Sequence, residues 1–114
     1  MRRRFILSLT VPVIAGACPA PRAKPDVRHP DPSVKVPAMK MAVRTHDHQA
    51  IAPLIDDLDS DDPAVRLYAI EALRRITGDD HGYQYWDDAL QRAPAIKRWR
   101  QWLAESRNRP TTDS

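Results

Sequence analysis

Apolar residues recur at helical spacing between residues 63 and 77, and charged side chains lie off this stripe. The apolar positions are Val65, Ala69, Ala72, Leu73 and Ile76. Asp62 is a good N-cap, Pro63 suits the first helical position, and Gly78 supplies a C-terminal stop. The pattern therefore predicts a helix over residues 63–77.

A second stripe precedes this helix. Ile51, Leu54, Ile55 and Leu58 share one helical face. Thr45 or Asp47 can cap the start of such a helix, and Pro53 should kink it or lie in its early turns. The polar residues 59–61 predict the turn that ends it.

A third stripe lies near the C-terminus. Pro94 is expected to open a helix that places Ile96, Trp99, Trp102 and Leu103 on one face. Residues 79–92 read as a loop, with a helical turn at residues 87–91. No stretch alternates apolar and polar residues as a strand would, so the pattern predicts an all-α fold.

The first 17 residues have the parts of a signal peptide. Arg2, Arg3 and Arg4 precede an apolar run over residues 5–14, and small residues at 15–17 suit a cut before Cys18. The apolar run is shorter than the roughly 20 residues that a membrane-spanning helix needs. We therefore expect an exported protein.

Cys18 is the only cysteine of the chain, and its place after the small residues resembles a lipobox. Lipid attached to its thiol would anchor the chain to a membrane of the bacterial cell envelope. The alternative is an ordinary secretory cut at the same bond, which would leave a free thiol in an oxidising compartment.

Removal of the signal peptide changes the charge. The 18 basic residues of the whole chain become 18 − 3 = 15, against 15 acidic ones, so the mature chain is formally neutral. The high pI of the full sequence is therefore no argument for nucleic-acid binding, and we expect no nucleic-acid partner.

The prolines define the remaining organisation. Six of them lie between residues 19 and 37, where they predict an extended, disordered spacer over residues 18–38, including the anchor. The folded domain is expected over residues 39–106, and a disordered tail over residues 107–114.

Residues 51–77 resemble a HEAT repeat, in which two antiparallel helices meet at a short acidic turn. Leu54, Leu58, the turn at residues 61–63 and the apolar face of the following helix carry the likeness. The continuation through Trp99 and Trp102 is similar to small HEAT-type lipoproteins of planctomycetes. The resemblance implies architecture and location, without an enzymatic mechanism. Because only one repeat is present, we expect the third helix to cover one face of the pair, and the other face is a candidate contact surface.

The sequence contains no strong pattern of metal-binding or catalytic residues. Asp57, Asp59 and Asp61 imitate the start of a calcium loop, but the later positions of that loop do not follow. His46, His48 and His81 are interpreted as solvated polar residues rather than metal ligands. We predict no catalytic residue, no cofactor and no metal site.

Four residues are candidates for protein contact. Arg66 is expected to bind Asp59 or Asp61 in the turn, and Tyr83, Tyr85 and Trp86 can either form an aromatic contact patch or cap the core. The favoured function is a non-enzymatic, lipid-anchored scaffold or protein-interaction domain with an unidentified protein partner. The alternatives are an accessory factor or enzyme of the HEAT-like chromophore-attachment type, and a secreted domain without lipid.

Overall fold

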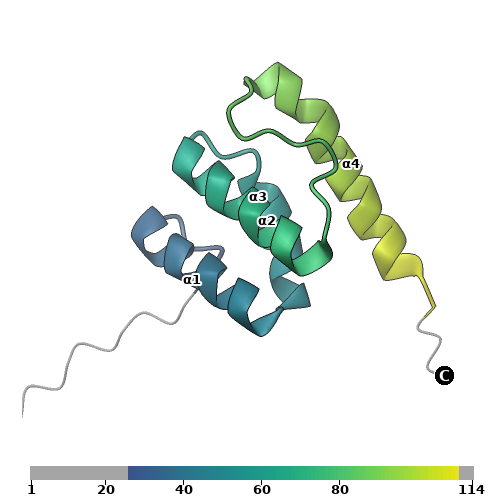
Figure 1. Cartoon of the computed structure of the whole chain (residues 1–114), viewed down its shortest axis with the longest axis horizontal. Helices are drawn as coiled ribbons and strands as arrows, with labels where there is room; N and C mark the ends of the chain where they lie inside the picture. Colours follow the sequence, from purple (N-terminus) through teal and green to yellow (C-terminus); the bar gives the residue numbers. More distant parts are fainter. Residues whose placement is uncertain (1–25, 111–114) are drawn as a thin grey trace, which may run out of the picture.

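Four α-helices and one short 3₁₀ helix make up the regular structure of residues 26–110, the part of the chain that the computed structural model describes (Figure 1). The elements are α1 (Pro32–Thr45), the 3₁₀ helix η1 (His48–Ala50), α2 (Ile51–Asp57), α3 (Pro63–Thr77) and α4 (Ala89–Asn108). Residues 26–110 contain no strand, so the all-α prediction is confirmed for them. The expected signal peptide, Cys18 and residues 19–25 lie outside the described residues.

Helix α3 begins and ends where the sequence predicts. Oδ1 of Asp62 accepts a hydrogen bond from the backbone N–H of Ala64 at 2.8 Å, and Pro63 is the first helical residue. Gly78 ends the helix in the left-handed conformation with φ of 84°, which favours glycine because no Cβ is present. Both ends are thus determined by local chemistry.

Helix α2 is entered through a short tight turn. Asp47 accepts a hydrogen bond from the backbone N–H of Gln49 at 3.0 Å and caps η1, which leads directly into α2. Pro53 is the third residue of α2. The first N–H groups of a helix have no partner within it, so the missing N–H of proline removes no hydrogen bond here. The predicted cap at Asp47 and the early position of Pro53 are confirmed.

The predicted extended spacer is wrong for residues 32–38, because they form the first half of α1. Asp31 caps the helix by accepting from the N–H of Ser33 at 2.9 Å, and Pro32 occupies the first helical position. Pro37, the sixth residue, removes only the bond to the carbonyl of Ser33, and both residues are exposed, so water can reach that carbonyl. The folded unit therefore starts before residue 39.

Helix α4 is longer at both ends than predicted. It begins at Ala89 rather than Pro94, with Asp88 as its N-cap, and it continues to Asn108, so the predicted tail is wrong for residues 107 and 108. Pro94 is the sixth residue here too, and the carbonyl it leaves unbonded belongs to the exposed Leu90. Proline in the second turn is thus tolerated twice, each time on the solvent side.

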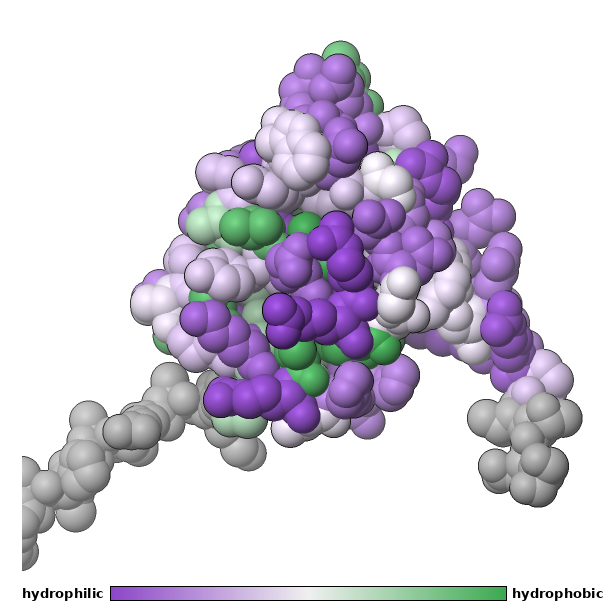
Figure 2. Space-filling model, viewed as in Figure 1, coloured by the Kyte–Doolittle hydropathy of each residue, from purple (hydrophilic) through white to green (hydrophobic). Residues whose placement is uncertain are grey.

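The helices surround one core. Helix α2 runs antiparallel to α3, α1 packs beside α3, and α4 packs against α2 (Figure 1). The face of the α2–α3 pair that was expected to stay open is covered by α1. The surface seen in Figure 2 is mainly hydrophilic, with small separate apolar patches.

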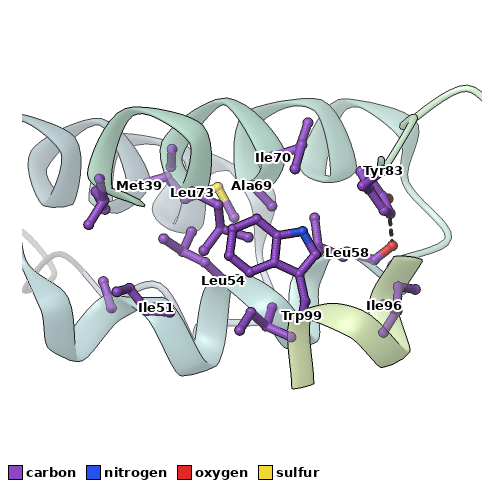
Figure 3. Close-up of a cluster of buried hydrophobic side chains, with 14 of the residues drawn as sticks. Met39, Ile51, Leu54, Leu58, Ala69, Ile70, Leu73, Tyr83, Ile96 and Trp99 are labelled. Carbon is purple, nitrogen blue, oxygen red and sulfur yellow. Dashed lines mark hydrogen bonds between the residues drawn. The ribbon is translucent and has the colours of Figure 1, made fainter. Parts of the chain in front are cut away.

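Large apolar side chains from all four helices fill the interior (Figure 3). Trp99 of α4 is fully buried and reaches the core between α2 and α3, beside Leu54, Leu58 and Leu73. Met39 supplies the contribution of α1. The predicted apolar stripes of α2 and α3 are therefore the core faces of these helices, whereas on α4 Ile96 and Trp99 are buried and Trp102 and Leu103 are half-buried at the edge of the core.

Candidate interaction surfaces

Arg66 is a structural residue rather than a surface one. Its guanidinium donates from Nη1 to the carbonyl of Ser60 at 2.7 Å and from Nε to the carbonyl of Tyr85 at 3.0 Å. The expected ion pair with Asp59 or Asp61 is wrong, because backbone carbonyls take the donors instead. Arg66 is buried and ties α3 to the loops on both of its sides.

Tyr83 closes the core at the end of α2. Only 2 % of it is exposed, and its hydroxyl donates to the carbonyl of Leu58 at 2.6 Å (Figure 3). Burial disfavours the charged phenolate and raises the pKa of Tyr83 to about 12. Of the two roles open for Tyr83, the structure supports the core cap.

Tyr85 and Trp86 divide between core and surface. Tyr85 is half-buried and packs against the core, and the ring of Trp86 meets it edge-to-face at a centroid distance of 5.2 Å. Trp86 is 66 % exposed. It is the one of the four candidate residues that presents a large apolar surface to solvent.

Leu90 is a second large apolar side chain exposed near the start of α4, and sequence reasoning missed it. It is 86 % exposed on the first turn of α4. The start of α4 lies at the top of the view in Figure 1, and apolar atoms are visible at the top of Figure 2. The sequence placed α4 after Pro94, so residue 90 received no helical interpretation. We refer to Trp86 and Leu90 as the apolar tip; the carboxylates of Asp87 and Asp88 lie between them in the chain.

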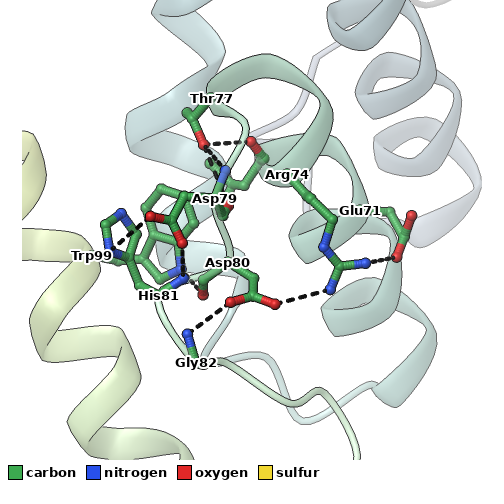
Figure 4. A network of polar contacts seen from close by, with 9 residues as sticks. Glu71, Arg74, Thr77, Asp79, Asp80, His81, Gly82 and Trp99 are labelled. Atoms are coloured by element: carbon green, nitrogen blue, oxygen red, sulfur yellow. Dashed lines mark hydrogen bonds and ion pairs between the residues drawn. The ribbon is translucent and has the colours of Figure 1, made fainter.

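The loop between α3 and α4 is held by a polar network (Figure 4). The carboxylate of Asp80 accepts from the backbone N–H of Gly82 at 2.8 Å and from Arg74 at 3.4 Å. The carbonyl of Asp80 accepts from Nε1 of Trp99 at 3.0 Å. These bonds join the loop to α3 on one side and to the core tryptophan on the other.

His81 belongs to this packing. Its ring meets Trp99 edge-on at a centroid distance of 4.3 Å, and its Nδ1 lies 4.0 Å from a carboxylate oxygen of Asp79. Only 19 % of its side chain is exposed, so the interpretation as a solvated residue is wrong for His81. The hydrogen bond from its own N–H to the Asp79 side chain lowers the pKa of that carboxyl.

Two carboxylates of the acidic segment at residues 56–62 have structural roles. Asp57 pairs with Lys35 of α1 at 2.7 Å, and Asp62 caps α3. Burial raises the pKa of Asp57 against the opposing effect of Lys35. Within residues 26–110, no three histidine, cysteine or carboxylate side chains lie together as metal ligands would.

Comparison with known proteins gives no relative: no family model, no curated protein and no solved structure matches this chain. None of the helices in the described part of the chain is long and apolar enough to cross a bilayer. The geometry of residues 26–110 is therefore the basis on which function is argued.

Proposed function

We propose that this chain is a lipid-anchored protein of the bacterial cell envelope, whose helical domain binds a protein partner and has no catalytic role. The observation that carries the proposal is the apolar tip. Trp86 and Leu90 are 66 % and 86 % exposed, more than the two other large apolar side chains that reach solvent, Met41 at 43 % and Tyr68 at 36 %. Tryptophan is among the residues most enriched in the centres of protein interfaces, because it buries a large area with little conformational freedom to lose.

The support around the tip favours a preformed contact. Trp86 rests edge-to-face on Tyr85, and the carbonyl of Tyr85 accepts from the buried Arg66. Leu90 is carried by a helix whose N-cap, Asp88, bonds the N–H of Gln91 at 2.8 Å. Binding of a partner would therefore cost little conformational entropy at this surface.

A HEAT-like origin of the domain is part of the proposal. Helices α2 and α3 are antiparallel and are joined by the short acidic turn that ends in Asp62 and Pro63. A single pair of this kind needs neighbours to cover its faces, and α1 and α4 take that place here. Such an arrangement is a closed domain rather than one unit of a longer array.

The anchor is proposed on the sequence before the described residues. Eight residue steps separate Cys18 from Asp26, and an extended chain covers at most roughly 3.6 Å per residue. Asp26 would thus stay within roughly 29 Å of a lipidated Cys18. The domain would remain near the bilayer, which suits a partner in the envelope.

Site-specific photocrosslinking in cells tests the interaction. A photoreactive amino acid in place of Trp86 should give a discrete crosslinked product in the membrane fraction, and Leu90→Ser should remove that product. The same amino acid in place of the exposed Arg100 of α4 is the matched control. Equal crosslinking from both positions, or none from position 86, would contradict a specific contact at the apolar tip.

A further inference from the structure

The N-caps and the last turns of three helices carry opposite charges. Helices α1, α3 and α4 run in the same sense in Figure 1, so their N-caps lie at one end and their last turns at the other. The N-caps are Asp31, Asp62 and Asp88, and the last turns carry Arg44, Arg75 and Arg107. Helix dipoles favour this distribution. The end with the N-caps also bears the apolar tip, and the opposite end carries these arginines together with the carboxylates of Asp47, Asp79, Asp80 and Glu105.

A groove lies at the end with the last turns, between the last turns of α4, the start of α2 and the end of α3. Its volume is about 620 Å³, and its floor is apolar: Ile51, Ile76, Trp102 and Leu103. Arg28 and Arg107 lie on its rim, and no carboxylate side chain lines it. We refer to it as the basic groove.

We propose that the basic groove docks on an anionic phospholipid surface. This inference rests on the proposed membrane anchor, which it deepens by naming the face that meets the bilayer. Among the described residues, neither Arg28 nor Arg107 has an ion-pair partner, so both are available to phosphate groups. Arginine binds phosphate through two parallel N–H donors.

The apolar floor fits the same occupant. Trp102 and Leu103 are half-buried, so each still presents part of its side chain to the groove. Tryptophan is enriched at the level of the headgroups, where an apolar ring and a polar edge are both satisfied. A lipid surface supplies phosphate for the rim and acyl carbon for the floor.

The position of the chain end favours a membrane over other occupants. Arg28 lies on the rim of the groove and only ten residues after Cys18. A lipid on Cys18 would therefore keep this groove within reach of the headgroups, because ten residues of extended chain cover at most roughly 36 Å. When the groove docks on the bilayer, the apolar tip at the other end of α4 faces away from it, toward a partner.

Vesicle co-sedimentation tests the inference without the lipid anchor. The protein is the chain from residue 18 onward with Cys18→Ser, since all buried core residues lie between residues 38 and 99. The vesicles are phosphatidylcholine alone, or phosphatidylcholine mixed with phosphatidylglycerol. Binding should require phosphatidylglycerol. The double variant Arg28→Glu/Arg107→Glu should weaken it by at least roughly 30-fold, since each cation near an anionic surface contributes about a five-fold factor.

The control variant is Lys97→Glu/Arg100→Glu, which makes the same change in net charge on the part of α4 outside the groove. It should retain most of the binding, and both double variants should keep the wild-type melting temperature because all four side chains are exposed. Equal loss in both would show that net charge alone drives binding and would overturn the site. Self-association that Arg107→Glu abolishes, without vesicle binding, would assign the groove to a second copy of the chain instead.

The proposed anchor and the proposed role of the groove are tested by independent measurements. Acylation of Cys18 is read by the mass of the native protein, whereas the vesicle assay uses a protein that carries no lipid. Charge-dependent vesicle binding with an unmodified native Cys18 would keep the groove and remove the anchor. Acylation of Cys18 without vesicle binding would keep the anchor and remove the groove.

Discussion

Trp99→Ala should destabilise the domain more than any other single truncation in α4. Trp99 is fully buried, packs edge-on against both His81 and Trp102, and donates from Nε1 to the carbonyl of Asp80. Removing a buried tryptophan costs about 3–5 kcal/mol from lost burial and the cavity that remains. Because the Asp80 carbonyl also loses its donor, we expect a loss in the upper half of that range, about 4–5 kcal/mol.

This loss is large relative to the whole domain. Residues 26–110 are 110 − 25 = 85 residues, and domains of that length have a free energy of unfolding of roughly 4–13 kcal/mol. We expect the melting temperature, followed by far-ultraviolet circular dichroism, to fall by about 15 °C or more, or the variant not to fold at all. Trp86→Ala is the matched control, because its ring is mostly exposed, and it should change the free energy of unfolding by less than about 0.5 kcal/mol. A loss below about 1 kcal/mol for Trp99→Ala would refute the packing described here.

Three further changes test other parts of the structure by urea unfolding. Tyr83→Phe should cost roughly 1–3 kcal/mol, because the carbonyl of Leu58 loses its buried donor. It should also reduce alkaline unfolding. The pKa of Tyr83 rises from 10.0 to about 12 in the folded state, so the neutral side chain stabilises the fold below pH 10, and this stabilisation is lost as the pH rises toward 12. If Tyr83→Phe leaves the pH dependence of the free energy of unfolding unchanged, this explanation is contradicted. Lys35→Met should destabilise by roughly 1–3 kcal/mol, and adding Asp57→Leu should recover most of that loss; no recovery would show that the pair is not a buried charge pair. Arg66→Met should lower the free energy of unfolding by roughly 1–3 kcal/mol as well, because the carbonyls of Ser60 and Tyr85 lose their donor. An unchanged free energy of unfolding would place Arg66 on the surface.

The elements that sequence reasoning located well have strong local signals. Helix α3 is bounded by an aspartate–proline start and by Gly78, and these residues act within a few positions of themselves. The apolar stripes of α2, α3 and α4 predict the core because burial follows helical periodicity. Trp99 was expected to be buried for the same reason, and it is.

The errors come from prolines and from backbone partners. Pro32 favours a helix start, but among so many prolines it was interpreted as part of a spacer, and α1 was missed. Pro94 by itself predicts a helix start, although it lies in the second turn of α4. The partners of Arg66 are backbone carbonyls of Ser60 and Tyr85, and a carbonyl is present at every position, so no residue type marks them.

The candidate surface was found only in part for a related reason. Trp86 stood out as a large aromatic residue in a loop, but Leu90 looked ordinary until α4 was seen to begin before it. The basic groove gave no signal in the sequence, because Arg28, Ile51 and Trp102 come from distant segments. Only their packing brings cations and apolar side chains to one place.

The tether of the domain to a membrane through Cys18 is a proposal. Intact mass spectrometry of the protein from native membranes, with Cys18→Ser as the control, tests it most directly. We predict a mature chain that begins at Cys18 with the added mass of its acyl chains, absent in the variant. An unmodified Cys18 at the mature N-terminus, or a chain that still carries Met1, would contradict the account.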